Sequence, residues 1–344
     1  MGLRLEPIDE YLHELGPEEN FNESMYFNVI DPTSRLGAWF RLANRANEGT
    51  GEMTVCIYLP DGRAAFTFFR PKITNNEKFD AAGMRFEVVT PFEELKVTYE
   101  GKVCLLDEPL QLADPKEALT SNPWIECEVD LTYRGVAPPF GGEPDEPHEK
   151  PGEEFAKGHY EQLVGARGSI RVGDLEWEID GYGLRDHSWG PRYWQAPWYY
   201  RWLTANFGDG FGFMGSRIAR RDGAGTRGGF VWDGEALHLC HDFEISTAWT
   251  GDDDPYHQSI NATLRTRDKE WTVTGEVASL IPLRNRRTTP EGEQLVTRIS
   301  EGMTKWTLQS GVDAAGEELK GRVGYGLSEY LDQIVDGQPV GLAE

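Results

Sequence analysis

The chain has 344 residues, of which 39% are hydrophobic and 12% aromatic, enough for two ordinary domains or one large β domain. Its formal net charge of −24 argues against nucleic acid and anionic membrane surfaces as partners, because both require a basic face. The composition is that of a folded globular protein whose partner is neither nucleic acid nor an anionic membrane.

The first residues and the cysteines predict a location. Residues 1–20 carry several acids and no apolar core, unlike a signal peptide. No apolar run approaches the ~20 residues that a membrane-spanning helix needs. The four cysteines are far apart and form no CxxC pair. We therefore expect a cytoplasmic protein with reduced thiols and no membrane insertion.

After a short helix expected at residues 8–15, strand patterns dominate. Hydrophobic residues alternate over residues 53–59 and 64–68, on either side of Asp61 and Gly62. This pattern is typical of a β-hairpin, because Asp-Gly readily adopts positive φ angles. The same arrangement of strand, Gly-containing turn and strand is predicted for residues 97–105, 170–179, 207–213 and 231–239.

Further strands are expected near residues 258–266, 271–277, 294–299, 305–309 and 322–327. No long stretch has a helical period, which disfavours parallel α/β folds. Many successive antiparallel strands indicate a sandwich or a closed barrel. The proline-rich, acidic segment 136–158 cannot bury a core and is predicted to be a mobile loop or linker. We therefore expect two β domains, residues 1–179 and residues 180–344.

Residues 181–202, GYGLRDHSWGPRYWQAPWYYRW, concentrate aromatic and charged side chains. Charged groups among large aromatics are costly unless they are paired or solvated. One interpretation is a partly enclosed, aromatic-walled site with a few directed polar groups. The other is an aromatic plug between two domains, with Arg185 and Asp186 as a structural ion pair. The predicted lining residues are Trp189, Trp194, Trp198, Tyr200, Trp202, Tyr160, Arg185 and Arg192.

The direction of each side chain follows from strand alternation. In an extended segment His187 and Trp189 point to the same side, with Asp186 supporting from behind. Glu161 is a candidate acid if burial raises its pKa, and otherwise forms an ion pair at a rim. The stripe of Trp198, Tyr200 and Trp202 fits either a core or a ligand wall. Arg185 and Arg192 fit structural partners of acids as well as ligand clamps.

Two motifs carry a resemblance to a known group of proteins. They are GHYEQ at residues 158–162 and GYGLRDHSWGPRYW at residues 181–194. A third segment, GYGLSEYLD at residues 324–332, adds to the resemblance. Through these motifs the chain resembles the superfamily of carotenoid 1,2-hydratase (hydroxyneurosporene synthase), AttH-like proteins and kievitone hydratase. Within that superfamily it is most similar to an uncharacterised bacterial branch. The resemblance covers nearly the whole chain. It implies an all-β fold of two tandem lipocalin-like (calycin-type) antiparallel barrels that hold hydrophobic, often isoprenoid, ligands.

The resemblance also implies roles for individual residues. His187 would handle the proton of a water molecule, and Trp189 would face a carbocation formed by protonation of an alkene. Both roles suit the side chains, because an imidazole titrates near neutrality and an indole face attracts positive charge. The hydratases' proposed acid, an Asp close to a Tyr, has no counterpart in residues 210–221. Asp186 or Glu161 would have to take that role.

The sequence thus leaves two classes of function. One is a cofactor-independent lyase or isomerase, of hydratase or dehydratase type, with His187, Asp186 and Glu161 as its catalytic residues. Its substrate would be a hydrophobic isoprenoid-, steroid- or aromatic-like molecule. The alternative is a non-catalytic carrier of such a ligand. No metal ligand set, P-loop, G-x-S-x-G or G-x-G-x-x-G motif is present, so neither a metal nor a cofactor is expected. A monomer and a homodimer both fit the sequence.

Overall fold

The computed structural model describes residues 2–145, 155–251, 254–288, 292 and 294–342. Strands account for 63% of the structure and helices for 6%, and the paired strands run antiparallel. The all-β antiparallel class predicted from the sequence is therefore confirmed. The chain divides into two compact units, Met1–Tyr193 and Trp194–Glu344. No described helix is long and apolar enough to cross a membrane.

The first unit contains short helical turns and most of the strands. Its helical elements are η1 (Pro7–Glu10), η2 (Ala46–Glu48), η3 (Pro109–Ala113) and α1 (Pro115–Ser121). Its strands are β1 (Leu3–Arg4), β2 (Phe21–Asp31), β3 (Leu36–Arg45), β4 (Thr50–Tyr58), β5 (Ala64–Phe69), β6 (Asp80–Ala81), β7 (Met84–Thr90), β8 (Glu94–Leu106), β9 (Trp124–Gly135), β10 (Phe140–Pro144), β11 (Gly158–Val172) and β12 (Leu175–Pro191).

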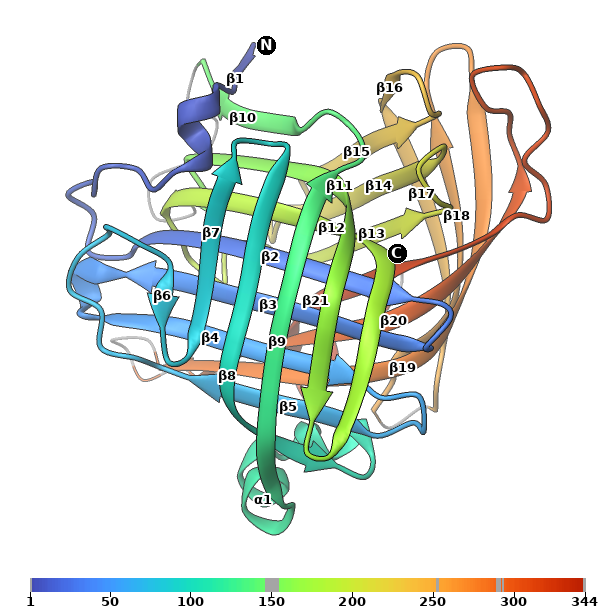
Figure 1. The fold of residues 1–344 in the computed structure, drawn as a ribbon. Helices are drawn as coiled ribbons and strands as arrows, with labels where there is room; N and C mark the ends of the chain where they lie inside the picture. The colour runs from blue at the N-terminus through green and yellow to red at the C-terminus, as the bar shows by residue number, and fades with distance from the viewer. Residues whose placement is uncertain (1, 146–154, 252–253, 289–291, 293, 343–344) are drawn as a thin grey trace. The chain divides into compact units, whose positions relative to one another are not determined.

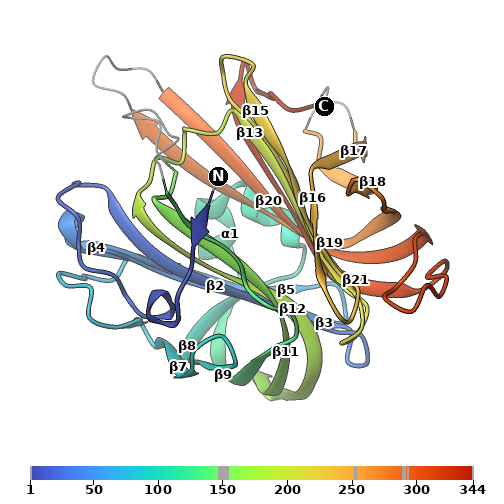
Figure 2. The same ribbon diagram turned by 90° about the horizontal axis from the view of Figure 1, so that it is seen from above.

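The strands of the first unit pair in the order β1, β10, β11, β12, β2, β3, β4, β5, β8, β7 and β6. β9 pairs with both β11 and β8 and so connects two distant positions along this order. β7, β8 and β9 run across β2, β3 and β4 (Figure 1), and the view from above shows the two groups of strands as separate layers (Figure 2). Closure into a lipocalin-like barrel stays a prediction.

The core of the first unit lies between these two groups of strands. Phe27 of β2, Phe40 of β3, Val55 of β4, Val97 of β8 and Leu131 of β9 are all buried in one hydrophobic cluster. Each side chain lies on the face of its strand that points into the core, and the neighbouring residues along the strand point to the opposite face. Burying a side chain of this kind contributes ~1.5–3 kcal/mol, so these residues hold the two groups of strands together.

The N-terminal helix is shorter than predicted. η1 ends at Glu10, and Tyr11 is already extended at φ −94° and ψ 170°. Pro7 starts the turn because its fixed φ suits the first helical position. The prediction of a helix over residues 8–15 is wrong beyond Glu10, since the extended chain directs the Glu10 side chain inward, where it is fully buried.

Most of the predicted hairpins are confirmed. β4 and β5 pair from Tyr58 opposite Ala64, around the Asp61-Gly62 turn. The turn predicted at residues 100–101 is wrong. β8 runs through it without interruption, because Gly101 pairs with Cys127 of β9 in regular register.

Segment 136–158 lies inside the first unit rather than between the units. Residues 140–144 form β10, which pairs with β11 on one side and with β1 on the other. Residues 146–154 of the predicted loop lie outside the described residues. β12 pairs along most of its length with β11 and with β2. The motif around His187 therefore belongs to the first unit, although the sequence had placed it at the start of a second domain.

The second unit is also antiparallel. Its strands are β13 (Tyr199–Asn206), β14 (Gly212–Ala219), β15 (Gly225–Trp232), β16 (Leu237–Cys240), β17 (Asp242–Trp249), β18 (His257–Arg265), β19 (Glu270–Thr288), β20 (Gln294–Ser310), β21 (Val323–Val335) and β22 (Gln338–Pro339). The pairing order is β16, β15, β14, β13, β21, β20, β19, β18 and β17, with β22 on β21. The strands and turns predicted for residues 207–239 and the later strands are confirmed.

Candidate functional site

Three strands bring polar side chains together where β11 begins, β12 ends and β2 begins. His187 of β12 lies opposite Tyr160 of β11 on one side and Met25 of β2 on the other. Trp189 lies opposite Glu23 of β2. Because side chains alternate along a strand, His187 and Trp189 share a face, and their ring centroids are 5.5 Å apart. The predicted same-face arrangement is confirmed.

The N-terminal segment completes this group. It carries Glu10 and His13 to the same point, and the His13 ring lies 5.7 Å from the ring of His187. The sequence prediction missed Glu10, His13 and Glu23. One signal was present for Glu23, which lies in a segment with six apolar residues between positions 21 and 30, where an unpaired acid would be costly to bury. Nothing in the sequence indicated which histidines would pair with it.

Glu23 bridges the two histidines. Its Oε1 lies 2.8 Å from Nδ1 of His13 and 2.7 Å from Nε2 of His187. Its Oε2 accepts hydrogen bonds from Nδ2 of Asn76 at 3.0 Å and from the backbone N–H of His13 at 3.1 Å. The side chains of Glu23 and His187 are fully buried, whereas that of His13 is 20% exposed. Both carboxylate oxygens are therefore fully engaged inside the protein.

The bridge controls the ionisation of Glu23 and His13. Burial alone would raise the pKa of Glu23, but hydrogen bonds and charge from His13 and His187 outweigh it and lower the pKa to about 2. Burial alone would lower the pKa of His13. Glu23 and Asp9, whose Oδ1 lies 3.3 Å from Nε2 of His13, raise it instead. The arrangement thus favours an ionised carboxylate beside a protonated imidazole.

A second buried network adjoins the first. Arg185 donates to both carboxylate oxygens of Glu10, at 2.6 and 2.8 Å, and to Oε1 of Gln162 at 2.7 Å. Tyr160 donates to Oε1 of Glu10 at 2.7 Å and lies 3.5 Å from Nδ1 of His187. Burial raises the pKa of Tyr160 well above its usual value, so this phenol stays neutral. Arg185 is thus an ion-pair partner of Glu10 that holds Tyr160 beside His187.

Trp189 is enclosed on both sides. His13 stacks on the indole at a centroid distance of 3.9 Å and an angle of 16°. On the other side a Cβ at Gly158 would lie 2.2 Å from Cζ2 of Trp189, so only glycine fits there. The indole N–H has no hydrogen-bond partner among the described residues. The predicted contact of Trp189 with a ligand stays a prediction, because the His13 ring covers one face of the indole in this structure.

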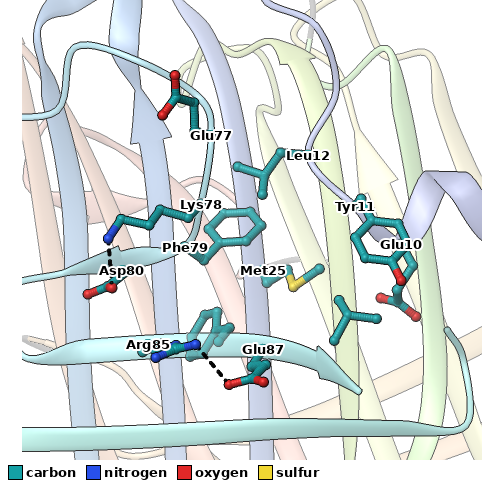
Figure 3. Close-up of a pocket in the computed structure, with 12 residues that line it drawn as sticks. Glu10, Tyr11, Leu12, Met25, Glu77, Lys78, Phe79, Asp80, Arg85 and Glu87 are labelled. Atoms are coloured by element: carbon teal, nitrogen blue, oxygen red, sulfur yellow. Dashed lines mark hydrogen bonds and ion pairs between the residues drawn. The ribbon is translucent and has the colours of Figure 1, made fainter. Parts of the chain in front are cut away.

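A cavity of about 310 Å³ lies next to the two networks. Its apolar lining includes Leu12, Met25, Phe79, Phe86 and Val88, and Figure 3 shows the ion pairs Lys78–Asp80 and Arg85–Glu87 among its other lining side chains. Glu10 also lines the cavity. Phe79 meets the ring of His187 edge-on at 5.9 Å. The cavity is thus large enough for a small apolar molecule, and it reaches the buried networks through Glu10 in its lining and through Phe79, which contacts His187.

The three residues predicted to be catalytic do not come together. Asp186 and Glu161 lie opposite each other in the β11–β12 register and project from the face that His187 does not use. There Nε2 of His159 lies 3.6 Å from Oε1 of Glu161 and 3.9 Å from Oδ2 of Asp186. Arg192 donates to Oγ of Ser188 at 2.7 Å on this same face. Asp186 therefore lies on the opposite face of β12 from His187, as strand alternation predicts, and its supporting role stays a prediction.

The remaining predicted lining residues, Trp194, Trp198, Tyr200 and Trp202, belong to the second unit. The apolar core of that unit takes Leu203 and Ala205 from β13. Tyr200 and Trp202 occupy the alternate positions and point away from that core, although both are buried. The hydroxyl of Tyr200 donates to Glu329 of β21. Their predicted role in ligand binding stays a prediction.

His13, Glu23 and His187 are also the residues best placed to hold a metal ion. Among the described residues they form a group whose ligand atoms all lie within 4.8 Å of one another. Two imidazoles and a carboxylate are ligands that zinc accepts. Sequence spacing could not show this set, since it joins three separate segments. The contacts from Glu23 to both rings have the lengths of hydrogen bonds.

The pH dependence of stability should report the Glu23 bridge. A carboxyl group whose pKa falls from 4.5 to about 2 stabilises the fold above pH 4.5, and this contribution is lost as the pH falls toward 2. His13, with a raised pKa, contributes below its ordinary value of 6.5 and loses that contribution as the pH rises. The melting temperatures of the wild type and Glu23→Gln should therefore differ most between pH 4.5 and 6.5. A difference that does not vary with pH would contradict this assignment.

The sequence matches the family described as Domain of unknown function (DUF7064) over residues 6–334. No match is found among curated protein sequences. Among solved structures the chain is similar to CghA, with a TM-score of 0.54, 12% identity, and coverage of 91% of this chain and 88% of that one.

Two further solved structures have the same fold. A putative AttH from Nitrosomonas europaea has a TM-score of 0.54 and 13% identity, with 92% of this chain and 94% of that one covered. Kievitone hydratase from Nectria haematococca has a TM-score of 0.53 and 11% identity, with 92% and 90% covered. The fold resemblance expected from the two motifs is confirmed by these structures. At such low identity they establish the fold alone.

Proposed function

The chain belongs to the DUF7064 family, and we propose that it is a hydratase- or dehydratase-type lyase or isomerase. It acts without a cofactor on a hydrophobic small molecule, of the size of an isoprenoid or aromatic fragment, bound in the cavity beside His187. The observation that carries the proposal is the bridge from Glu23 to His187, fully buried at 2.7 Å next to that cavity. The kievitone hydratase fold supports the same reaction type.

The residues divide the chemistry as follows. His187 transfers a proton to or from the reacting carbon or oxygen, as a positioned imidazole does near neutral pH. Glu23 fixes the orientation of the His187 ring through Nε2. Tyr160 lies near Nδ1 as a neutral phenol whose O–H is donated to Glu10. The apolar side chains of the cavity hold the hydrophobic substrate, and a water molecule adds to a carbocation or leaves from an alcohol.

A carrier of a hydrophobic ligand is the second candidate. The observation that favours it is the enclosure of Trp189, because the indole cannot face a cation while His13 stacks on it. An apolar cavity alone suffices for a carrier. A carrier has no need of two histidines on one buried carboxylate, and therefore the enzyme is preferred.

The test uses the full-length chain purified gently and examined by native mass spectrometry. We expect a co-purifying hydrophobic molecule, and incubation in H₂¹⁸O should label its hydroxyl group only when the active protein is present. Treatment with a chelator should leave labelling and the melting temperature unchanged. Binding without labelling would favour the carrier, and loss of labelling on chelation would contradict a metal-free reaction.

A further inference from the structure

The charged side chains at the mouth of the cavity take no part in the chemistry assigned to His187. Nζ of Lys78 lies 3.0 Å from Oδ2 of Asp80, and a guanidinium nitrogen of Arg85 lies 3.0 Å from Oε2 of Glu87 (Figure 3). The four side chains are between 40% and 71% exposed. They therefore lie where the cavity opens to solvent, which is where the outer end of a ligand would be.

The interior of the cavity offers a ligand few hydrogen bonds. Met25, Phe79 and Phe86 are buried in its lining. Among the described lining residues the one buried polar group is the carboxylate of Glu10, and Arg185 already donates to both of its oxygens. Because an unpaired polar group is costly to bury, the polar end of a ligand lies at the mouth and its apolar body lies inside.

We propose that the cavity takes amphiphiles whose polar end is a hydroxyl group and discriminates against those that end in a carboxylate. The proposal rests on the proposed function and names the class of its substrate. Both cations at the mouth already have a carboxylate partner. Glu77 lines the cavity as a third exposed acid, so that three acids stand against two bases there. An anionic ligand would thus meet an excess of negative charge, in a chain whose net charge is −24.

A hydroxyl group suits an ion pair better than a carboxylate does. An ion pair presents an acceptor and a donor side by side, and a hydroxyl group can donate to the one and accept from the other. A carboxylate can only accept, so it would compete with Asp80 for Lys78 or with Glu87 for Arg85 and leave that acid without its partner. Binding of an alcohol or a phenol keeps both ion pairs intact.

The same orientation directs the apolar end of the ligand toward His187. Phe79 meets the His187 ring edge-on at 5.9 Å, and Met25 lies opposite His187 in the β2–β12 register. A double bond at the apolar end would therefore lie nearest to the imidazole to which proton transfer is assigned. A substrate with a hydroxyl group at one end and a C=C bond toward the other meets both requirements.

Two probes with the same ten-carbon chain, geraniol and geranate, test this selection on the full-length protein. Isothermal titration calorimetry at neutral pH should show that geraniol binds about 10-fold more tightly than geranate, the order expected for like charges a few ångströms apart near solvent. Added salt should narrow the difference, because the charges at the mouth are exposed.

A double variant, Asp80→Asn with Glu87→Gln, should change the preference. It frees both cations at the mouth, so geranate should bind about 10-fold more tightly than it does to the wild type, while geraniol binding changes little. The matched control is Glu126→Gln, which removes an acid paired with Lys102 at 3.3 Å outside the cavity lining, where the two side chains are 64% and 61% exposed. It should leave both affinities unchanged.

Val88→Trp places the ligand. Val88 is a half-buried lining residue, so the larger side chain should fill the cavity, abolish geraniol binding and leave the melting temperature close to that of the wild type. Geraniol binding that survives in the folded variant would place the ligand elsewhere and overturn both the selection and the proposed site.

The other outcomes separate the selection from the proposed function. Equal wild-type affinities for geraniol and geranate, or a double variant with no gain for geranate, would overturn the selection and leave the proposed function intact. No binding of either probe would also overturn the selection, while the ¹⁸O labelling of a co-purifying molecule would still decide the function. A confirmed preference for geraniol without any such labelling would support the selection, and the enzyme assignment alone would fail.

Discussion

His187→Gln is expected to lower turnover ~100-fold or more, because it removes the imidazole to which we assign proton transfer. This ring is bridged to Glu23 and contacts Phe79 in the cavity lining. The melting temperature should change little. Glutamine keeps much of the volume, and its amide can still donate to Glu23. Turnover, ligand affinity and melting temperature measured on the same preparations check this expectation.

Three patterns of results are distinguishable for His187. A purely structural histidine would give a lower melting temperature with unchanged affinity and unchanged activity per folded molecule. A carrier would show no turnover in either protein, with affinity following Trp189→Phe more than His187→Gln. Full activity in a stable His187→Gln protein would end the catalytic assignment of this residue.

Arg185→Met is expected to destabilise the first unit by about 3–5 kcal/mol, because it leaves the buried Glu10 carboxylate without its charged partner. The Arg185 guanidinium donates to Glu10 at 2.6 and 2.8 Å with both side chains fully buried. Chemical denaturation followed by tryptophan fluorescence measures the loss. Replacing Glu10 by Met in the same chain should recover part of it, since an apolar pair avoids the uncompensated charge.

The matched control for Arg185 is Arg167→Met. Arg167 pairs with Asp180 at 3.1 Å, but the two side chains are 72% and 71% exposed. Exposed ion pairs are worth about 1 kcal/mol or less, so this variant should unfold almost as the wild type does. Equal losses of unfolding free energy in Arg185→Met and Arg167→Met would contradict this prediction. The buried pair would then not stabilise the positions of Tyr160 and His187.

The sequence by itself determined the class of fold and the centre of the site. Alternating hydrophobic residues and Asp-Gly turns determine strands and hairpins locally, because a strand has a period of two and such turns need positive φ angles. The same alternation correctly placed His187 and Trp189 on one face. It also placed Asp186 on the opposite face of the strand from His187, since neighbours along a strand point to opposite faces.

The tertiary structure alone decided which groups surround His187. Glu23 lies 164 positions before His187, and Glu10 lies 175 positions before Arg185. Such contacts depend on strand register and on the path of the N-terminal segment, neither of which leaves a local pattern in the sequence. The predicted helix at residues 8–15 had to end at Glu10 for that side chain and His13 to reach the interior. The charges that set the pKa of Glu23 thus come from segments that only folding brings together.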